Sequence, residues 1–257
     1  MSVLQIVAAI LIGLVTGLIT SLIGASGVSI VVPALTLLFA LGSHVAIGTS
    51  LLVDVITSIV VAIGYFRAGN VRLTASLWLA VGSVCGSLLG AHWAGIIPDA
   101  VLNTVFAVVL LLSGIATLRR GGKQVQVKEA KLSKGAQTAA LLGLGFVIGI
   151  ISGLVGAGGG VMMLVAIIFV LHYPMHEAVG TSTVIMAITA LTSLLGYARQ
   201  GHVAWNWGLL IAVGAVIAGF FGAKMANKID EVKLNKIVAW LFIALAILMI
   251  AMRMFGH

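Results

Sequence analysis

The chain contains two copies of one segment. Residues 13–118 align without a gap on residues 145–250, a constant shift of 132 positions, and about three in ten of the aligned pairs are identical. The pattern His-x-Ala-x-Gly-Thr-Ser, for example, occupies 44–50 and again 176–182. In an apolar chain such a duplication is typical of secondary transporters, whose substrate site lies between the two copies.

The composition limits the chain to a membrane environment. It is 61% hydrophobic and only 8% charged, whereas a soluble domain carries about 25% charged residues. No Asp, Glu, Lys or Arg occurs between Ser2 and Val53. We therefore expect an all-α polytopic membrane protein.

The remaining composition argues against several partners. The net charge is +8, but the basic residues lie in loops between apolar runs, so we expect no nucleic-acid partner. The single cysteine, Cys85, lies inside an apolar segment. No His or Cys has a second ligand at metal-ligand spacing, and we expect no metal and no cofactor.

Five hydrophobic segments are predicted in each half. The first repeat, 1–118, has segments at 3–23, 28–41, 44–65, 73–96 and 100–118. The second repeat, 136–257, has segments at 136–155, 160–172, 176–197, 205–224 and 233–252. A basic linker, 119–135, joins the two repeats. Because a full crossing needs about 20 residues, segments 28–41 and 160–172 are candidates for half-helices or re-entrant segments.

The distribution of Lys and Arg predicts the topology. If all ten segments change sides, one side receives twelve of the 14 Lys and Arg residues and the other side two. Cytoplasmic loops carry the excess of basic residues, so the linker is expected in the cytoplasm, next to anionic lipid, and both termini outside the cell (inner) membrane. Five crossings per half is an odd number, so the second repeat should be inverted relative to the first.

Glycine-rich turns follow the first segment of each half. A glycine turn that leads into a short helix presents backbone N–H groups and the positive end of the helix dipole, which together bind anions. Glycine also permits close helix packing, and the sequence alone leaves both interpretations open. The candidate substrate-binding residues in the turns are Gly24, Ala25, Ser26, Gly27, Gly156, Gly158, Gly159 and Gly160.

Hydroxyl side chains recur near the start of the third segment of each half. They can donate to an oxyanion, or they can bond back to the preceding helical turn. The candidates are Thr49, Ser50, Thr181, Ser182 and Thr183.

Three charged residues are further candidates. Asp54 lies within segment 44–65, and an intramembrane carboxyl group is by default a functional hypothesis, here proton coupling. Its counterpart in the second copy is Met186. Arg67 and Arg199 follow two matching helix ends; each could attract anions to a vestibule, or could extend to the interface and cap carbonyls.

The glycine turns and the His-x-Ala-x-Gly-Thr-Ser stretches together resemble the TauE/SafE sulfite-exporter family, over essentially the whole chain. This resemblance implies transport, usually outward, of sulfite, thiosulfate or organosulfonates such as sulfoacetate. We expect alternating access, with the two halves rocking about the glycine turns. Segments rich in small residues, such as Gly82 to Gly90 and Gly214 to Gly222, would supply sliding surfaces or the surfaces of a homodimer.

Two other functions fit parts of the sequence. A passive anion channel would use the same glycine turns. An intramembrane serine protease would use the Gly-x-Ser-Gly match at 24–27, with Ser26 as nucleophile, but it needs a histidine within hydrogen-bond reach. No histidine lies deep in a segment, and the second copy has Gly158 in place of the serine. We therefore expect a transporter and not an enzyme.

Overall fold

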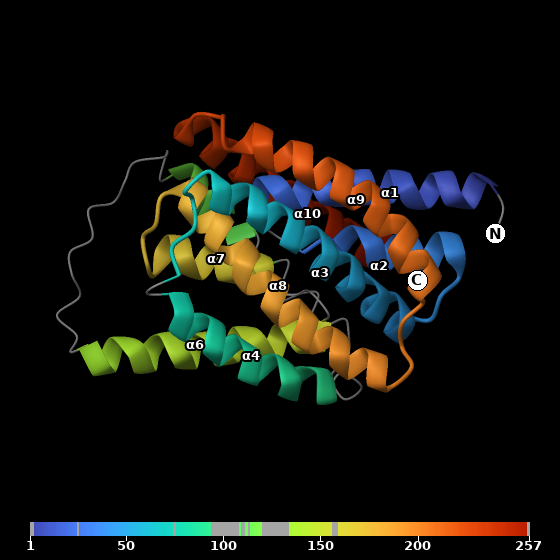
Figure 1. Ribbon diagram of the computed structural model, residues 1–257, viewed down its shortest axis with the longest axis horizontal. Coiled ribbons are helices and arrows are strands. Elements are labelled where there is room, and N and C mark those ends of the chain that lie inside the picture. The colour runs from blue at the N-terminus through green and yellow to red at the C-terminus, as the bar shows by residue number, and fades with distance from the viewer. Residues whose placement is uncertain are drawn as a thin grey trace.

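The computed structural model describes residues 3–24, 26–73, 76–93, 108, 111–112, 114–119, 134–155 and 159–255. The described residues form helices joined by short connections, and none of them lies in a β-strand (Figure 1). The helices of the first repeat are α1 (Val3–Ile23), α2 (Val28–Phe39), α3 (Ser43–Arg67) and α4 (Ser76–His92). Those of the second are α6 (Lys134–Val155), α7 (Gly160–Phe169), α8 (Met175–Arg199), α9 (Trp205–Ala226) and α10 (Glu231–Phe255).

The all-helical membrane fold predicted from the sequence is confirmed. Among the residues that the structure describes, four helices are long and apolar enough to cross a membrane, over Val3–Ile23, His44–Arg67, Met175–Arg199 and Trp205–Ala226. Most of predicted segment 100–118 lies outside the described residues, although residues 114–119 are helical.

Helices α2 and α7 are too short to cross a membrane alone. They contain 12 and 10 residues, or about 18 and 15 Å at the helical rise of about 1.5 Å per residue. The hydrocarbon core of a bilayer is about 30 Å thick. The two short predicted segments are therefore half-length helices, each preceded by a glycine turn.

The two copies are interleaved. The most extensive contacts join α1 to α9 and α4 to α6, and α3 packs against both α8 and α9 (Figure 1). The first helix of each repeat therefore lies against the fourth helix of the other repeat, so the two sequence halves are not separate bodies in space.

Glycines hold these helix pairs at backbone contact. A Cβ atom added to Gly13 of α1 would lie 2.0 Å from the Ile211 carbonyl oxygen of α9. The counterpart in the second copy, Gly145 of α6, would place a Cβ 2.1 Å from the Leu79 carbonyl oxygen of α4. Only glycine allows this approach, and the same geometry occurs in both copies.

The small residues of α4 and α9 are buried inside the chain. Gly82 lies against the Leu142 carbonyl of α6, and Gly214 lies against the Ile10 carbonyl of α1. The expectation that these faces supply a homodimer surface is therefore wrong. The alternative, that they supply sliding surfaces, stays a prediction.

The equivalent helices α3 and α8 run in opposite directions. A Cβ on Gly48, near the start of α3, would lie 1.9 Å from the carbonyl oxygen of His202, just beyond the end of α8. A Cβ on Gly180, near the start of α8, would lie 2.1 Å from the carbonyl oxygen of Asn70, just beyond the end of α3. The start of each helix thus meets the end of the other, and α3 and α8 are antiparallel.

Candidate functional site

The glycine turn between α1 and α2 is bound to Asp54 in the middle of α3. The Ser26 hydroxyl donates a hydrogen bond to Oδ2 of Asp54, and the Gly27 N–H donates to Oδ1 at 2.9 Å. The Val28 N–H donates to Ser26 Oγ at 3.2 Å. The structure therefore joins two features that the sequence presented separately, namely the first glycine turn and the intramembrane carboxyl group.

This arrangement stabilises a helix end that lies away from water. Asp54 is 0% exposed, and a buried carboxyl group is tolerated only when it is hydrogen-bonded. The N-terminus of α2 supplies one N–H donor and a partial positive charge, which favour a carboxylate. The position at which the first turn was predicted to bind an anion thus already holds the chain's own carboxyl group.

The hydroxyl stretch of the second copy touches the first turn. Gly24 has a left-handed φ of 58°, and a Cβ there would lie 2.5 Å from Ser182 Oγ and 2.9 Å from Thr183 Oγ1. Both hydroxyls donate to the Val179 carbonyl, at 3.0 and 2.7 Å. The structure therefore brings predicted residues from both repeats together at one turn.

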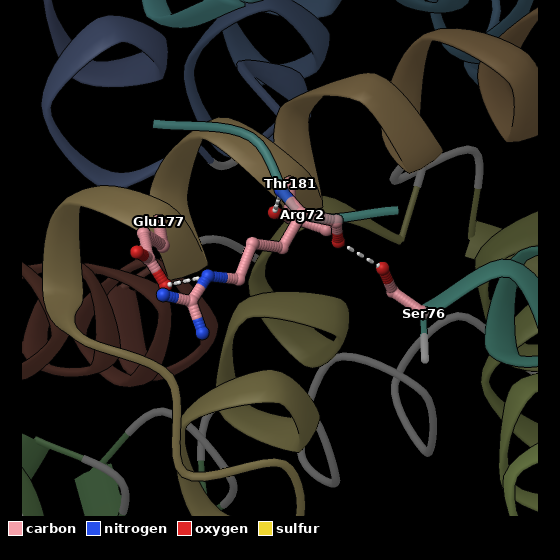
Figure 2. A network of polar contacts seen from close by, with 4 residues as sticks. All are labelled: Arg72, Ser76, Glu177 and Thr181. Atoms are coloured by element: carbon pink, nitrogen blue, oxygen red, sulfur yellow. Dashed lines mark hydrogen bonds and ion pairs between the residues drawn. The ribbon is translucent and has the colours of Figure 1, made fainter. Parts of the chain in front are cut away.

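Two equivalent threonines hold the connections that follow the long central helices. The Thr49 hydroxyl accepts the Ala204 N–H at 2.9 Å and donates to the Val45 carbonyl at 2.6 Å. The Thr181 hydroxyl accepts the Arg72 N–H at 2.9 Å (Figure 2).

Ser50 lies one residue beyond Thr49 and is 0% exposed. Its hydroxyl donates to the Ile47 carbonyl at 2.8 Å. Ser50, like Thr49, Ser182 and Thr183, thus bonds back to the preceding helical turn. The role of these hydroxyls as substrate ligands stays a prediction.

The second glycine turn is described from Gly159 onward, and the predicted residues Ala25, Gly156 and Gly158 lie outside the described residues. Gly159 has φ 73° and forms the N-cap of α7, whose first residue is the buried Gly160. The Ser152 hydroxyl of α6 lies 3.1 Å from the position of a Cβ on Gly159. This hydroxyl is buried and has no hydrogen-bond partner among the described residues. The sequence analysis did not select Ser152, although it aligns with Thr20 in the repeat.

Arg67 and Arg199 lie in the last turns of α3 and α8. Both are exposed. Because these helices are antiparallel, the two arginines lie at opposite ends of the central pair. Their role as anion vestibules stays a prediction.

An ion pair that the sequence analysis missed links the end of α3 to the start of α8 (Figure 2). Arg72 Nε lies 2.8 Å from Glu177 Oε2, and the guanidinium lies 5.7 Å from the centroid of the Tyr173 ring. The Ser76 hydroxyl donates to the Arg72 carbonyl. In the repeat alignment Arg72 corresponds to Ala204, and Glu177 corresponds to Val45. Comparison of the repeats therefore gave no signal for this ion pair.

A bundle of apolar helices, with half-length helices beginning at glycine turns and buried polar contacts between repeats, defines a multi-pass membrane transport protein. The chain belongs to the TauE/SafE family, because the sequence model described as "Sulfite exporter TauE/SafE" matches residues 9–249.

Named relatives cover nearly the whole chain. The chain is 31% identical to "Probable membrane transporter protein YdhB" of Bacillus subtilis (strain 168), over 89% of this chain and 94% of the relative. It is 27% identical to "Probable membrane transporter protein MJ0441" of Methanocaldococcus jannaschii, over 86% of each chain. No solved structure matches significantly.

These relatives identify a transporter, not an enzyme, as the sequence analysis expected. The Ser26 hydroxyl, the nucleophile that a protease would need, donates to the carboxyl group of Asp54.

Proposed function

We propose that this protein is a secondary transporter that exports small sulfur-containing anions such as sulfite, thiosulfate or organosulfonates including sulfoacetate. The main support is the start of α7, where the N-cap residue Gly159 and the buried Ser152 hydroxyl, which has no partner among the described residues, lie together in the interior. Such groups can surround a diffuse anion without a buried cationic side chain. The family description, sulfite exporter, supplies the class of anion.

The packing indicates which parts would move in an alternating-access cycle. The pairs α1–α9 and α4–α6 are held at backbone contact by glycines, so each pair should move as one body. These bodies combine helices from both repeats, unlike the rocking sequence halves first expected. We propose that these two bodies move against each other across the antiparallel pair α3–α8. The two sequence repeats would then have opposite orientations in the bilayer.

Proton coupling is assigned to Asp54. Both carboxyl oxygens accept hydrogen bonds, as in an ionised carboxylate. Protonation on Oδ2 would turn this oxygen into a donor, and the Ser26 hydroxyl would then have to accept. The bond at the start of α2 would thereby change with the proton, which gives a physical link between protonation and the turn.

Flux measurements in proteoliposomes test this function. Protein reconstituted with an imposed pH gradient should accumulate sulfite or sulfoacetate against its concentration gradient, with saturable rates and with sulfate as the comparison anion. Dissipative flux alone would favour the passive channel. Asp54→Asn should transport without the pH dependence of the wild type, and an unchanged pH dependence would remove Asp54 from the coupling.

Crosslinking tests the assignment of the moving bodies, in a background that lacks the exposed Cys85. A disulfide between α1 and α9 should leave transport intact, whereas one between α3 and α8 should stop it. The opposite pattern would reject this assignment.

A further inference from the structure

We propose that the chain has one anion site, not two: the N-terminus of α7, formed by Gly159, Gly160 and the Ser152 hydroxyl, binds the sulfite or sulfonate group, while the equivalent start of α2 is occupied by the carboxyl group of Asp54. This inference rests on the proposed transport of small anions and specifies where in the chain the anion binds.

The start of α2 supplies the template. There a carboxyl group receives the N–H of the N-cap residue Gly27 and the hydroxyl of Ser26. The carboxyl group belongs to Asp54, which reaches the turn from the neighbouring helix α3. An oxyanion therefore fits at this helix start, and in the first copy it is part of the chain.

The second copy lacks this internal oxyanion. Met186 of α8 replaces Asp54, and Gly158 replaces Ser26, so neither the carboxylate nor its hydroxyl donor is present in the sequence. Met186 is 0% exposed and carries no charge. The first N–H groups of a helix have no partner within the helix, and among the described residues no carboxyl group bonds to the start of α7.

A buried hydroxyl supplies the independent evidence for a ligand. Ser152 Oγ of α6 lies against Gly159, at 3.1 Å from the position a Cβ would take, and it has no hydrogen-bond partner among the described residues. Ser152 is 1% exposed. A buried donor without a partner is costly, and an anion at the α7 start would accept this hydrogen bond.

The donors suit a compact oxyanion. Backbone N–H groups and one hydroxyl present several donors to one small acceptor group, as a sulfonate or sulfite requires. Close approach to the backbone is possible because Gly159 and Gly160 have no side chains. No lysine or arginine is described in contact with Ser152 or Gly159, so the helix dipole and the donors would carry the recognition.

Binding measurements on purified full-length protein test the site with a matched pair of variants. Calorimetric titrations with sulfite and sulfoacetate, at constant ionic strength, should show that Ser152→Ala raises the dissociation constant about tenfold or more, the effect of one hydrogen bond to a charged group. Thr20→Ala removes the equivalent buried hydroxyl of the first copy, which also lacks a described partner. This control should bind as the wild type does.

A second pair of variants introduces the missing carboxylate. Met186→Asp should place an oxyanion at the α7 start, as Asp54 does at α2, and should abolish detectable binding. Met186→Leu retains an apolar side chain and should preserve binding. Elution as a single species and an unchanged melting temperature establish that each variant is folded. If Met186→Asp does not fold, the comparison of Ser152→Ala with Thr20→Ala decides whether the site exists.

The outcomes separate the site from the function. If the wild type binds sulfite or sulfoacetate but Ser152→Ala binds equally well, the α7 site is wrong and the transport proposal stands. If it binds neither but binds sulfate or nitrate in a Ser152-dependent way, the site stands and the proposed substrates fail. If no anion binds, both proposals are overturned.

Discussion

Replacing Asp54 should separate its structural contribution from its charge. In Asp54→Ala, the Gly27 N–H and the Ser26 hydroxyl both lose their buried acceptor. Leaving a buried donor without a partner costs about 1–3 kcal/mol, so two donors together cost about 2–6 kcal/mol. For a chain of this size about 1 kcal/mol shifts the melting temperature by roughly 2–4 °C. The expected loss for Asp54→Ala is therefore on the order of 10 °C.

Asp54→Asn should behave differently. Its amide oxygen can still accept the Gly27 N–H, and its NH₂ group can donate to the Ser26 hydroxyl, whose proton is free to rotate. We therefore expect a melting temperature within a few degrees of the wild type, although the charge is gone. Ser26→Ala removes one of the two donors and should fall between the two Asp54 variants.

Thermal unfolding in detergent, followed by tryptophan fluorescence, measures these differences. Thr20→Ala is the control, because its buried hydroxyl has no described partner to lose. Equal melting temperatures for Asp54→Ala and Asp54→Asn would refute the argument that hydrogen bonds to this carboxyl group hold the first turn.

Three further predictions concern the packing and the ends of the central helices. Gly149→Ala should lower the folded yield sharply, because its Cβ would lie 2.2 Å from a backbone carbonyl oxygen of α4. The control Gly143→Ala, in the same helix, meets nothing within 4 Å and should be neutral or stabilising by up to about 1 kcal/mol. Size-exclusion chromatography and the melting temperature compare the two variants. Tyr65→Phe removes a buried 2.8 Å hydrogen bond to a backbone carbonyl and should cost about 1 kcal/mol in the same melting assay. Glu177→Gln should change stability by less than about 1 kcal/mol, because the Arg72 side chain is 59% exposed, although that of Glu177 is only 16% exposed, and an ion pair with a solvated partner contributes little. A coupling energy of several kcal/mol in a double-mutant cycle would contradict this.

The helices could be predicted from the sequence because their signals are local. Uninterrupted apolar runs gave α1 at 3–23 without error, and most other ends lie within about three residues of the predicted ones. Glycine-rich stretches marked the breaks before α2 and α7. The end of α7 at Phe169 was predicted three residues too late, because the apolar run continues through residues 170–171 while the backbone turns, with His172 at φ 56°.

The partners of the site residues could not be predicted, because they depend on how helices cross. Ser26 and Asp54 are 28 residues apart, and nothing in their spacing shows that they bond. The contact of Gly24 with Ser182 joins the two repeats and follows only from the antiparallel arrangement of α3 and α8. The interleaving of α1 with α9 likewise had no signal in the sequence, since the small residues on these helices fit any close-packed neighbour.

We expect differences between the two copies to identify functional positions better than the shared residues do. The shared elements, such as the glycine contacts of Gly13 and Gly145 and the hydroxyl contacts of Thr49 and Thr181, occur in both copies and build the same scaffold twice. In the inverted arrangement proposed above, such a scaffold would present equivalent environments to the two sides of a membrane. Directional coupling needs a departure from that equivalence. Asp54 opposite Met186 is such a departure, because in the proposals above it places a titratable carboxyl group at one helix start and leaves the other start open to an anion.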